Sequence, residues 1–194
     1  NLGGLLYYRQ NYPHLDLVGD FSLNCANDLS AREYLNRGLR LITPSYDLNA
    51  EQLDGMLRRI PGDRFELVLH QYMPMFHMEH CVFAALLSKG KDYRDCGRPC
   101  ESHSVELRDH TGAMLPVQAD VGCRNTVFNG KAQSGALYLE RFRSHGVRRF
   151  RVELLTDNAE RTAELLATYR RLLAGALTPR AAWGTLAATE RLGV

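Results

Sequence analysis

Short apolar runs alternate along the chain with segments in which apolar residues recur every three or four positions. The runs typical of β-strands are 15-LDLVGD-20, 39-LRLITPS-45, 65-FELVLHQY-72 and 147-VRRFRVELL-155. Those that begin near residues 15, 39 and 65 are 24 and 26 residues apart. That spacing is the period of a βα unit, and alternation of this kind favours a parallel sheet.

A helical pattern follows three of these runs. The predicted helices are 28-DLSAREYLNRG-38, 49-NAEQLDGMLRRI-60 and 158-NAERTAELLATYRRLLAG-175. Asp28 or Ser30 is the expected cap of the first, and Gly38 its end. The tail 178–193 is expected to form another helix, with Pro179 in its first turn. The opening segment 1-NLGGLLYY-8 is interpreted as the end of a strand or the turn after it.

The interval 73–146 interrupts this rhythm. It contains a predicted hairpin, 104-SVELRDHTGAMLPVQAD-120, and a predicted helix, 132-AQSGALYLERFRSHG-146. The expected fold is therefore α/β, with parallel βα units forming the later part of a TIM-like barrel. Residues 1–175 would make this partial barrel, with a Cys-rich insertion at 73–146, and residues 176–194 a helical tail. A separate flavodoxin-type domain is the alternative.

Composition narrows the class of protein only slightly. The 194 residues are 45% hydrophobic with a net charge of +2, which gives no charge-based case for a nucleic-acid or membrane partner. No window approaches the roughly 18 apolar residues of a membrane span, and no signal peptide is visible. We therefore expect a cytoplasmic protein. The chain begins with Asn rather than Met, so we expect it to be a piece of a longer protein.

Half a barrel would expose two strand edges, which are prone to pair with other strands. The expected partner is thus the remainder of a longer parent chain, or a second copy of this one. RNA or a small molecule is the expected substrate class, as the resemblance described below implies.

Four of the five cysteines fall inside the interruption with the spacing C-x14-C-x3-C-x22-C, at Cys81, Cys96, Cys100 and Cys123. Thiolates are soft ligands that suit zinc and iron–sulfur clusters. Structural zinc sites mostly use C-x2-C pairs, whereas the close pair here is C-x3-C. The spacing favours a [4Fe–4S] cluster. Zinc, or four buried thiols without a metal, are the alternatives. Cys25 stands apart and is expected to pack in the core.

Other polar residues surround these cysteines. Glu79 and His80 precede Cys81 directly and are candidates for a general acid/base pair, with a structural role as the alternative. Arg124 and Asn125 follow Cys123. Arg124 could hold a carboxylate or phosphate through two hydrogen bonds. The same polar density also suits a tight, hydrogen-bonded loop.

The segments 79-EHCVFAALL-87, 96-CGRPC-100, 107-LRDHTGAMLPVQAD-120 and 122-GCRNTVFNG-130 together resemble the collagenase-like peptidase family U-32, over roughly residues 15–175. The resemblance implies a TIM-barrel-like fold. Some family members resemble iron–sulfur factors for oxygen-independent hydroxylation of RNA bases or of the ubiquinone ring. It therefore implies a [4Fe–4S] cluster with four ligands, Cys81, Cys96, Cys100 and Cys123. The stretch 71-QYMPMFHMEHC-81 departs from the peptidase signature, which leaves the substrate class open.

The expected function is thus an iron–sulfur-dependent enzyme of the hydroxylation type that acts on RNA or a small aromatic ring. Arg124, Asn125 and His80 would position the substrate. The first alternative is a collagenase-like peptidase in which Glu79 or His80 polarises water, with zinc as the possible metal. The second is a non-catalytic scaffold in which a metal staples the insertion.

Overall fold

The computed structural model describes residues 1–90, 93–189 and 192–193. The chain divides into two compact units, each described separately below. Unit 1 comprises Asn1–Gln71 and Gln133–Val194, and unit 2 comprises Tyr72–Ala132. Residues 133–146, placed above in the Cys-rich insertion, therefore lie in unit 1.

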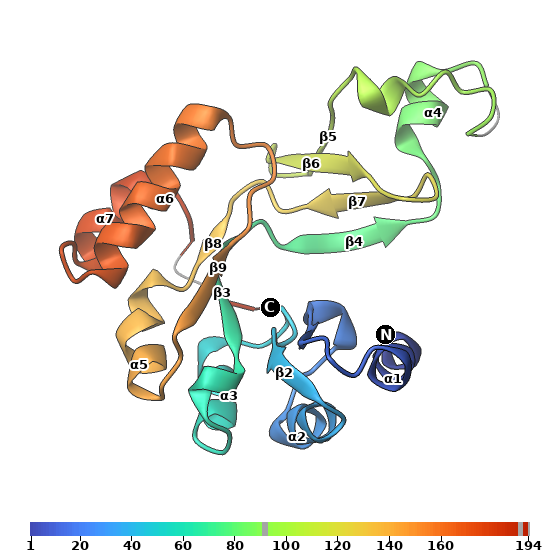
Figure 1. Ribbon diagram of the computed structural model, residues 1–194. Helices are drawn as coiled ribbons and strands as arrows, with labels where there is room; N and C mark the ends of the chain where they lie inside the picture. The colour runs from blue at the N-terminus through green and yellow to red at the C-terminus, as the bar shows by residue number, and fades with distance from the viewer. Residues whose placement is uncertain (91–92, 190–191, 194) are drawn as a thin grey trace. The chain divides into compact units, whose positions relative to one another are not determined.

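The sheets of unit 1 are largely parallel (Figure 1). β1 (Leu17–Gly19) pairs in parallel with β2 (Leu39–Ile42), and β3 (Glu66–Gln71) pairs in parallel with β9 (Arg149–Val152). A single parallel bridge, Ile42 to Phe65, links the two pairs. The short β8 (Gln133–Ser134) pairs antiparallel with β3. The prediction of an α/β fold with parallel βα units is confirmed, but the described strands do not close into a barrel.

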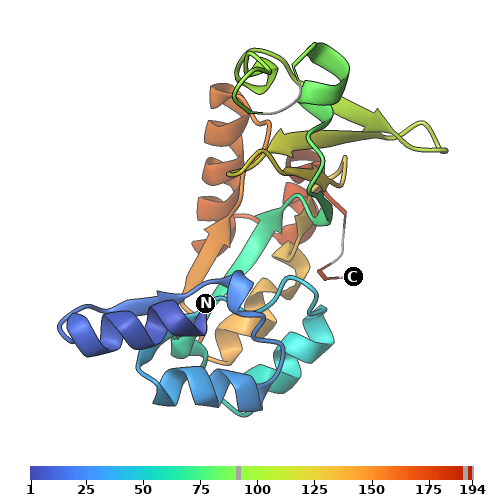
Figure 2. The ribbon, with the colours of Figure 1, turned by 90° about the vertical axis from the view of Figure 1, so that its right-hand side faces the viewer.

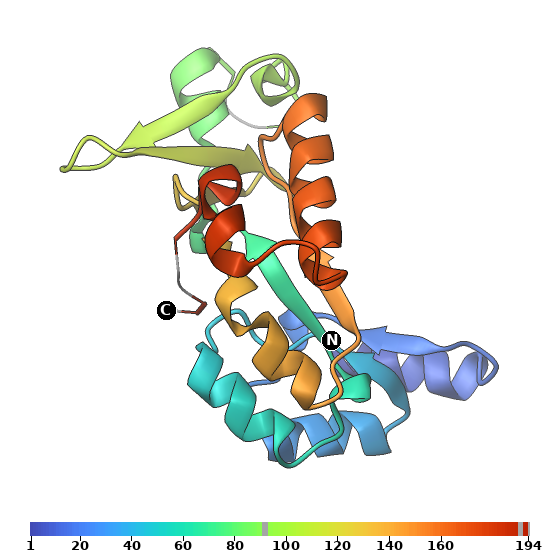
Figure 3. The same cartoon turned by 90° about the vertical axis from the view of Figure 1, so that its left-hand side faces the viewer.

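Unit 1 has six α-helices among its described residues. They are α1 (Leu2–Asn11), α2 (Asp28–Asn36), α3 (Ala50–Leu57), α5 (Leu139–Ser144), α6 (Ala159–Leu173) and α7 (Pro179–Leu186). Of these, α2, α3 and α6 follow strands as the βα rhythm predicts. The cap of α2 is Asn27, whose side chain accepts from the Ser30 amide, rather than Asp28 or Ser30. The chain leaves α2 through Gly38, whose φ of +100° is the left-handed conformation that glycine adopts readily. α6 and α7 pack side by side (Figure 3).

Two hydrophobic clusters form the core of unit 1. The first lies between the parallel strands and α3, whose apolar face contributes Leu53, Met56 and Leu57. The second lies between β3 and the helices α6 and α7, and is centred on Leu165 and Tyr169. Cys25 is completely buried in the first cluster, which confirms the core-packing interpretation. Burial raises the pKa of its thiol.

Besides the cap of α2, three local predictions were wrong. The opening segment is the helix α1, because the Asn1 side chain accepts from the Gly4 amide and caps it. The apolar residues of this helix show no helical period in the sequence, and only Leu5 of the helix is buried. The helix predicted over 132–146 begins only at Leu139, because residues 133–134 instead pair with β3. The tail helix ends at Leu186, where Ala187 turns left-handed. Its predicted final turn includes residues 190–191, which lie outside the described residues.

Unit 2 is built on an antiparallel sheet in the order β4 (Pro74–Met78), β7 (Asn125–Phe128), β6 (Met114–Ala119) and β5 (Val105–Arg108). The predicted hairpin is confirmed as β5 and β6, joined by a turn at Asp109–Gly112 that projects from the sheet (Figure 2). A short helix, α4 (Val82–Leu87), packs on the sheet through Phe83 against Val117 and Val127. No described helix in either unit is long and apolar enough to cross a membrane.

A buried carboxylate joins two helices of unit 1. Asp54 of α3 accepts from Arg141 Nε of α5 at 2.8 Å and lies 2.8 Å from His145 Nε2. Its other oxygen lies 2.7 Å from Arg58 Nη2, and the side chain is only 4% exposed. The hydrogen bond from Arg141, aided by His145 and Arg58, outweighs burial and holds the pKa of Asp54 far below its usual range.

We expect Asp54→Asn to lower the free energy of unfolding by about 2 kcal/mol at neutral pH, because charge-assisted hydrogen bonds are lost. The folded-state pKa is depressed, so this contribution is complete above the unfolded-state pKa of about 3.9 and is lost as the pH falls below it. Urea unfolding followed by circular dichroism should therefore show a gap between variant and wild type that narrows in acid. Asp63→Asn, at an exposed position, is the control. A gap that persists in acid would contradict the assignment.

Candidate metal centre in unit 2

Cys81 is held at the start of a helix. It is the N-cap of α4, where its backbone is extended and its Sγ accepts from the Ala84 amide at 3.5 Å. The preceding strand β4 ends at Met78, so only Glu79 and His80 separate Cys81 from the sheet. The sulfur is half-buried. Strand and helix together fix its position.

Cys96 and Cys100 lie on one tight loop. Gly97 and Arg98 between them are both left-handed, with φ values of +70° and +51°. The Arg98 amide donates to Cys96 Sγ at 3.4 Å, and Pro99 begins a 3-10 turn, η3 (Pro99–Glu101). N–H groups aimed at sulfur stabilise a thiolate and are common around metal-bound cysteines. α4 and η3 lie next to each other, which brings this loop to Cys81 (Figure 1).

Cys123 comes from the hairpin loop between β6 and β7. The Asp120 amide donates to the Arg124 carbonyl at 2.7 Å, and the Cys123 amide donates to the Asp120 carbonyl at 3.2 Å. Gly122 and Cys123 are left-handed, with φ values of +81° and +63°. Arg124 Nε donates to the Val121 carbonyl at 3.1 Å. Of the two interpretations offered for this segment, its contacts match the tight, hydrogen-bonded loop.

The four cysteines line one cavity. Its volume is about 250 Å³, and its other lining residues include Phe83, Tyr93, Pro99, Glu101 and Asp120. Burial, and then the negative charges of Cys81, Cys96 and Cys100, raise the pKa of Cys123. Four thiolates so close together repel one another unless a cation lies among them. The structure thus brings together residues that are up to 42 positions apart, from Cys81 to Cys123.

The donor set suits a metal or cluster in its chemistry. Thiols are the ligands that zinc and iron–sulfur clusters take, and two of the four sulfurs already accept backbone N–H bonds. Among the described residues, however, no three His, Cys, Asp or Glu side chains converge tightly enough to hold a single metal ion. The sulfurs surround a shared space and do not meet at one point.

Asn125 holds together two of the segments that carry these cysteines. Its side chain is fully buried, and its Oδ1 accepts from the Val82 amide at 2.7 Å. Its Nδ2 donates to the Arg124 carbonyl at 2.7 Å and points to Cys81 Sγ at 3.9 Å. The amide therefore connects the start of α4 with the end of the Cys123 loop. Such burial leaves no surface for the substrate contact expected of Asn125, and its contacts give it a positioning role instead.

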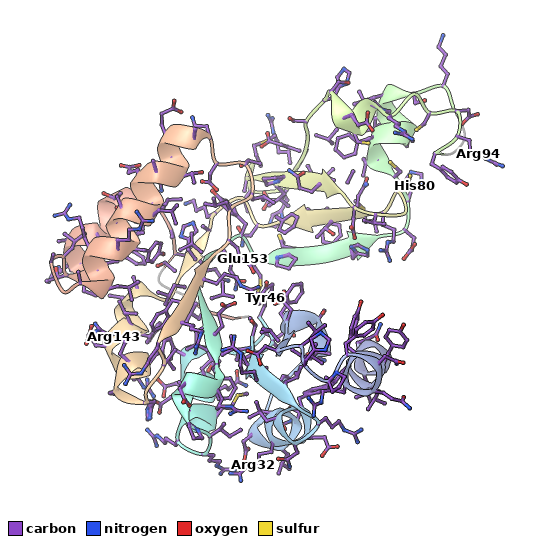
Figure 4. The ribbon with its side chains drawn as sticks, in the orientation of Figure 1. Arg32, Tyr46, His80, Arg94, Arg143 and Glu153 are labelled. Carbon is purple, nitrogen blue, oxygen red and sulfur yellow. The ribbon has the colours of Figure 1, made fainter. Side chains whose placement is uncertain are left out.

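The other predicted site residues lie at the surface of unit 2. Glu79 and His80 form the bend between β4 and α4, and both are exposed (Figure 4). Neither side chain makes a hydrogen bond or ion pair with a described residue. Arg124 is 40% exposed, and its Nη2 lies 3.6 Å from Asp120 Oδ2. His77 Nδ1 lies 2.7 Å from Thr126 Oγ1 across the β4–β7 pair. Glu79, His80 and Arg124 thus stay accessible next to the cysteines.

The comparison with protein families agrees with the resemblance seen in the sequence. The model of peptidase family U32 matches residues 1–191. The chain therefore belongs to peptidase family U32. No curated protein and no solved structure matched it.

We expect Asn125→Ala to loosen the centre without unfolding unit 1. Two buried backbone groups, the Val82 N–H and the Arg124 C=O, would lose their partner, at a cost of about 2 kcal/mol. Cys81 in the reduced, metal-free protein should then react several-fold faster with iodoacetamide, measured by mass spectrometry. Cys25, buried in the other unit, is the internal control, and Asn129→Ala is the matched variant. Unchanged labelling of Cys81 would contradict the positioning role.

Proposed function

We propose that this U32 protein is an iron–sulfur-dependent enzyme of the hydroxylation type, with a [4Fe–4S] cluster held by Cys81, Cys96, Cys100 and Cys123. The observation that carries the proposal is the shared cavity, which four cysteines from three separate loops line together. A bound cluster of this kind supplies one-electron transfer, which hydrolysis does not need. The proposed substrate is an RNA base or a small aromatic ring, and the oxygen atom comes from a donor other than molecular oxygen.

The shape of the cysteine site favours a cluster over a zinc ion. Zinc needs four donors that converge to about 2.3 Å from one point. Here the sulfurs surround a cavity of about 250 Å³, and no described group converges on a single ion. A four-iron cube places its ligands farther apart, at its corners. The C-x3-C loop, with two left-handed residues between its cysteines, also differs from the C-x2-C pair that is usual for zinc.

Residues beside the cysteines give the site its acid–base and anion-binding groups. Glu79 and His80 can hold and release a proton next to Cys81, because both are exposed and unpaired among the described residues. Arg124 can turn toward a substrate phosphate or carboxylate, because its ion pair with Asp120 is long, at 3.6 Å. Asn125 orients Cys81 and makes no contact with the substrate.

We further propose that unit 1 is part of a TIM-like barrel whose other strands come from the remainder of a parent chain or from a second copy. What supports this is the parallel arrangement of β1, β2, β3 and β9, each leading into a helix or loop. β1 has a described partner on one side only. Its exposed Val18 therefore lies on a strand edge of the kind that another strand covers.

The test is the iron and sulfide content of protein purified without oxygen. We expect about four iron and four sulfide per chain, with absorbance at about 400 nm. Cys96→Ser and Cys100→Ser should each lose most of the iron, because each removes a thiolate ligand. Cys25→Ser is the matched control and should retain it.

Other outcomes point to the remaining functions. One zinc and no sulfide would rule out the redox chemistry, and peptide hydrolysis that depends on Glu79 and His80 would then become the leading function. Iron that survives both serine substitutions would contradict the ligand set. Protein that holds a metal but is inert toward RNA, aromatic compounds and peptides would indicate a non-catalytic scaffold whose metal has a structural role.

A further inference from the structure

A second group of polar residues lies in unit 1, at the carboxyl ends of its strands. β1, β2, β3 and β9 all run in parallel, so their carboxyl ends point to the same side, although Ile42 at the end of β2 bridges to Phe65, just before β3 begins. The residues that follow or close these strands are Asp20, Thr43, Gln71 and Glu153. Ligands of parallel α/β sheets bind at the carboxyl edge, where the loops leave the strands.

One arginine, Arg151 of β9, organises three carboxylates: two follow strands at their carboxyl ends, and the third, Glu66, is the first residue of β3. Arg151 Nη1 lies 2.9 Å from Asp20 Oδ1 and 3.2 Å from Glu153 Oε1. Its Nε and Nη2 lie 2.7 and 2.6 Å from Glu66 Oε1. Nη2 also donates to Thr43 Oγ1 at 3.1 Å. The guanidinium is therefore fully used by protein groups, and it has no donor to spare for an anionic ligand.

The carboxylates, by contrast, are not saturated. Asp20, Glu66 and Glu153 each turn one oxygen to Arg151, and their second oxygens have no protein partner among the described residues. Three negative charges against one positive charge leave the group with a net charge of −2. The unused capacity at this edge consists of hydrogen-bond acceptors.

An aromatic pair flanks this group. The Phe21 and Tyr46 rings stack with centroids 4.1 Å apart and an angle of 17°. Tyr46 donates its hydroxyl to Glu153 Oε1 at 2.5 Å, and the two residues are neighbours in Figure 4. Phe21 is 40% exposed. A cation next to this edge would meet both an aromatic face and carboxylate oxygens.

A small cavity beside Tyr46 contains further unused acceptors. Its volume is about 20 Å³, which admits one group the size of water, and Ser45, Tyr46 and Gln71 line it. Gln71 is only 3% exposed, and its Oε1 has no hydrogen-bond partner in the part of the chain that the structure describes. Gln133 pairs directly with Gln71 across the sheet but does not line this cavity, and its Oε1 also has no hydrogen-bond partner among the described residues. Buried amide oxygens of this kind require a donor.

We propose that the carboxyl edge of unit 1 binds a small organic cation through a protonated nitrogen, either an ammonium or a guanidinium group. Each available group, from the carboxylates to the glutamine oxygens, accepts hydrogen bonds, and the net charge is negative. A bare metal ion does not fit, because no described group of carboxylates converges as metal ligands. An anion does not fit either, because the one cation at this edge is saturated by its own neighbours.

The proposal is tested by calorimetric titration of the full chain with butylammonium and butylguanidinium. At least one should bind, and the tighter of the two identifies the head group. Butylurea, the neutral isostere of butylguanidinium, and tetramethylammonium, which has charge but no donor, should bind at least tenfold more weakly. If butylurea or tetramethylammonium binds as tightly as the cations with donors, or if neither cation binds, the proposal is overturned.

Two variants locate the binding. Glu153→Gln and Asp20→Asn should each weaken the binding at least tenfold, because each removes one negative charge with little change in shape. Glu160→Gln, at an exposed position on α6, should bind as the wild type does. Asp20 is half-exposed, and an asparagine can still accept from the Phe21 amide, so this variant keeps the test valid even if Glu153→Gln fails to fold. Wild-type affinity in a folded Asp20→Asn protein would refute the site.

Discussion

The pairing of Gln71 with Gln133 is the contact on which the arrangement of the chain depends. Gln71 closes β3 and Gln133 opens β8, and the two are direct partners in the antiparallel ladder. The whole of unit 2 lies between them in the sequence. The ladder therefore holds together the two ends of a long segment. Closing that segment costs conformational entropy that grows with the logarithm of its length, and the interactions of the ladder offset this cost. β3 also pairs with β9, so the same strand anchors both the parallel sheet and the exit to unit 2.

Within unit 2 the cysteines reach one cavity from three different kinds of local structure. Cys81 caps a helix, Cys96 and Cys100 flank a left-handed turn, and Cys123 sits in a hairpin loop. None of these would fix the others alone. The buried amide of Asn125 connects the first with the last, because it binds the backbone of both. A polar group that is buried and fully used in this way makes a local arrangement specific.

Much of the fold followed from periodicity. The strands β1, β2, β3 and β9 and the helices α2, α3 and α6 have strong apolar patterns, and each was predicted close to its place. α1 was missed because it buries a single residue and so has no apolar face. β4 was missed because most of its side chains are exposed or half-exposed, which removes the alternation that marks a strand.

The candidate site also has a part that the sequence predicts and a part that it does not. The four cysteines could be recognised from the sequence alone, because their residue type and spacing indicate metal ligands even when the fold is unknown. The buried position of Asn125 was not visible, since its partners are backbone atoms that sequence does not identify. The group around Arg151 was not predicted, because its partners are distant in the sequence, up to 131 positions away at Asp20. The sequence did contain one sign of this group, because Asp20, Thr43 and Glu153 each lie in the last three residues of a predicted strand.

Because unit 2 lies between two paired residues of unit 1, it is connected in the chain as a loop between neighbouring strands would be. A β-hairpin of a few residues would make the same connection. Lengthening, shortening or replacing the segment 72–132 therefore leaves the parallel strands with an unchanged register. The cysteine-bearing unit is therefore a module in the topological sense, because its boundaries coincide with one residue pair of the β3–β8 ladder.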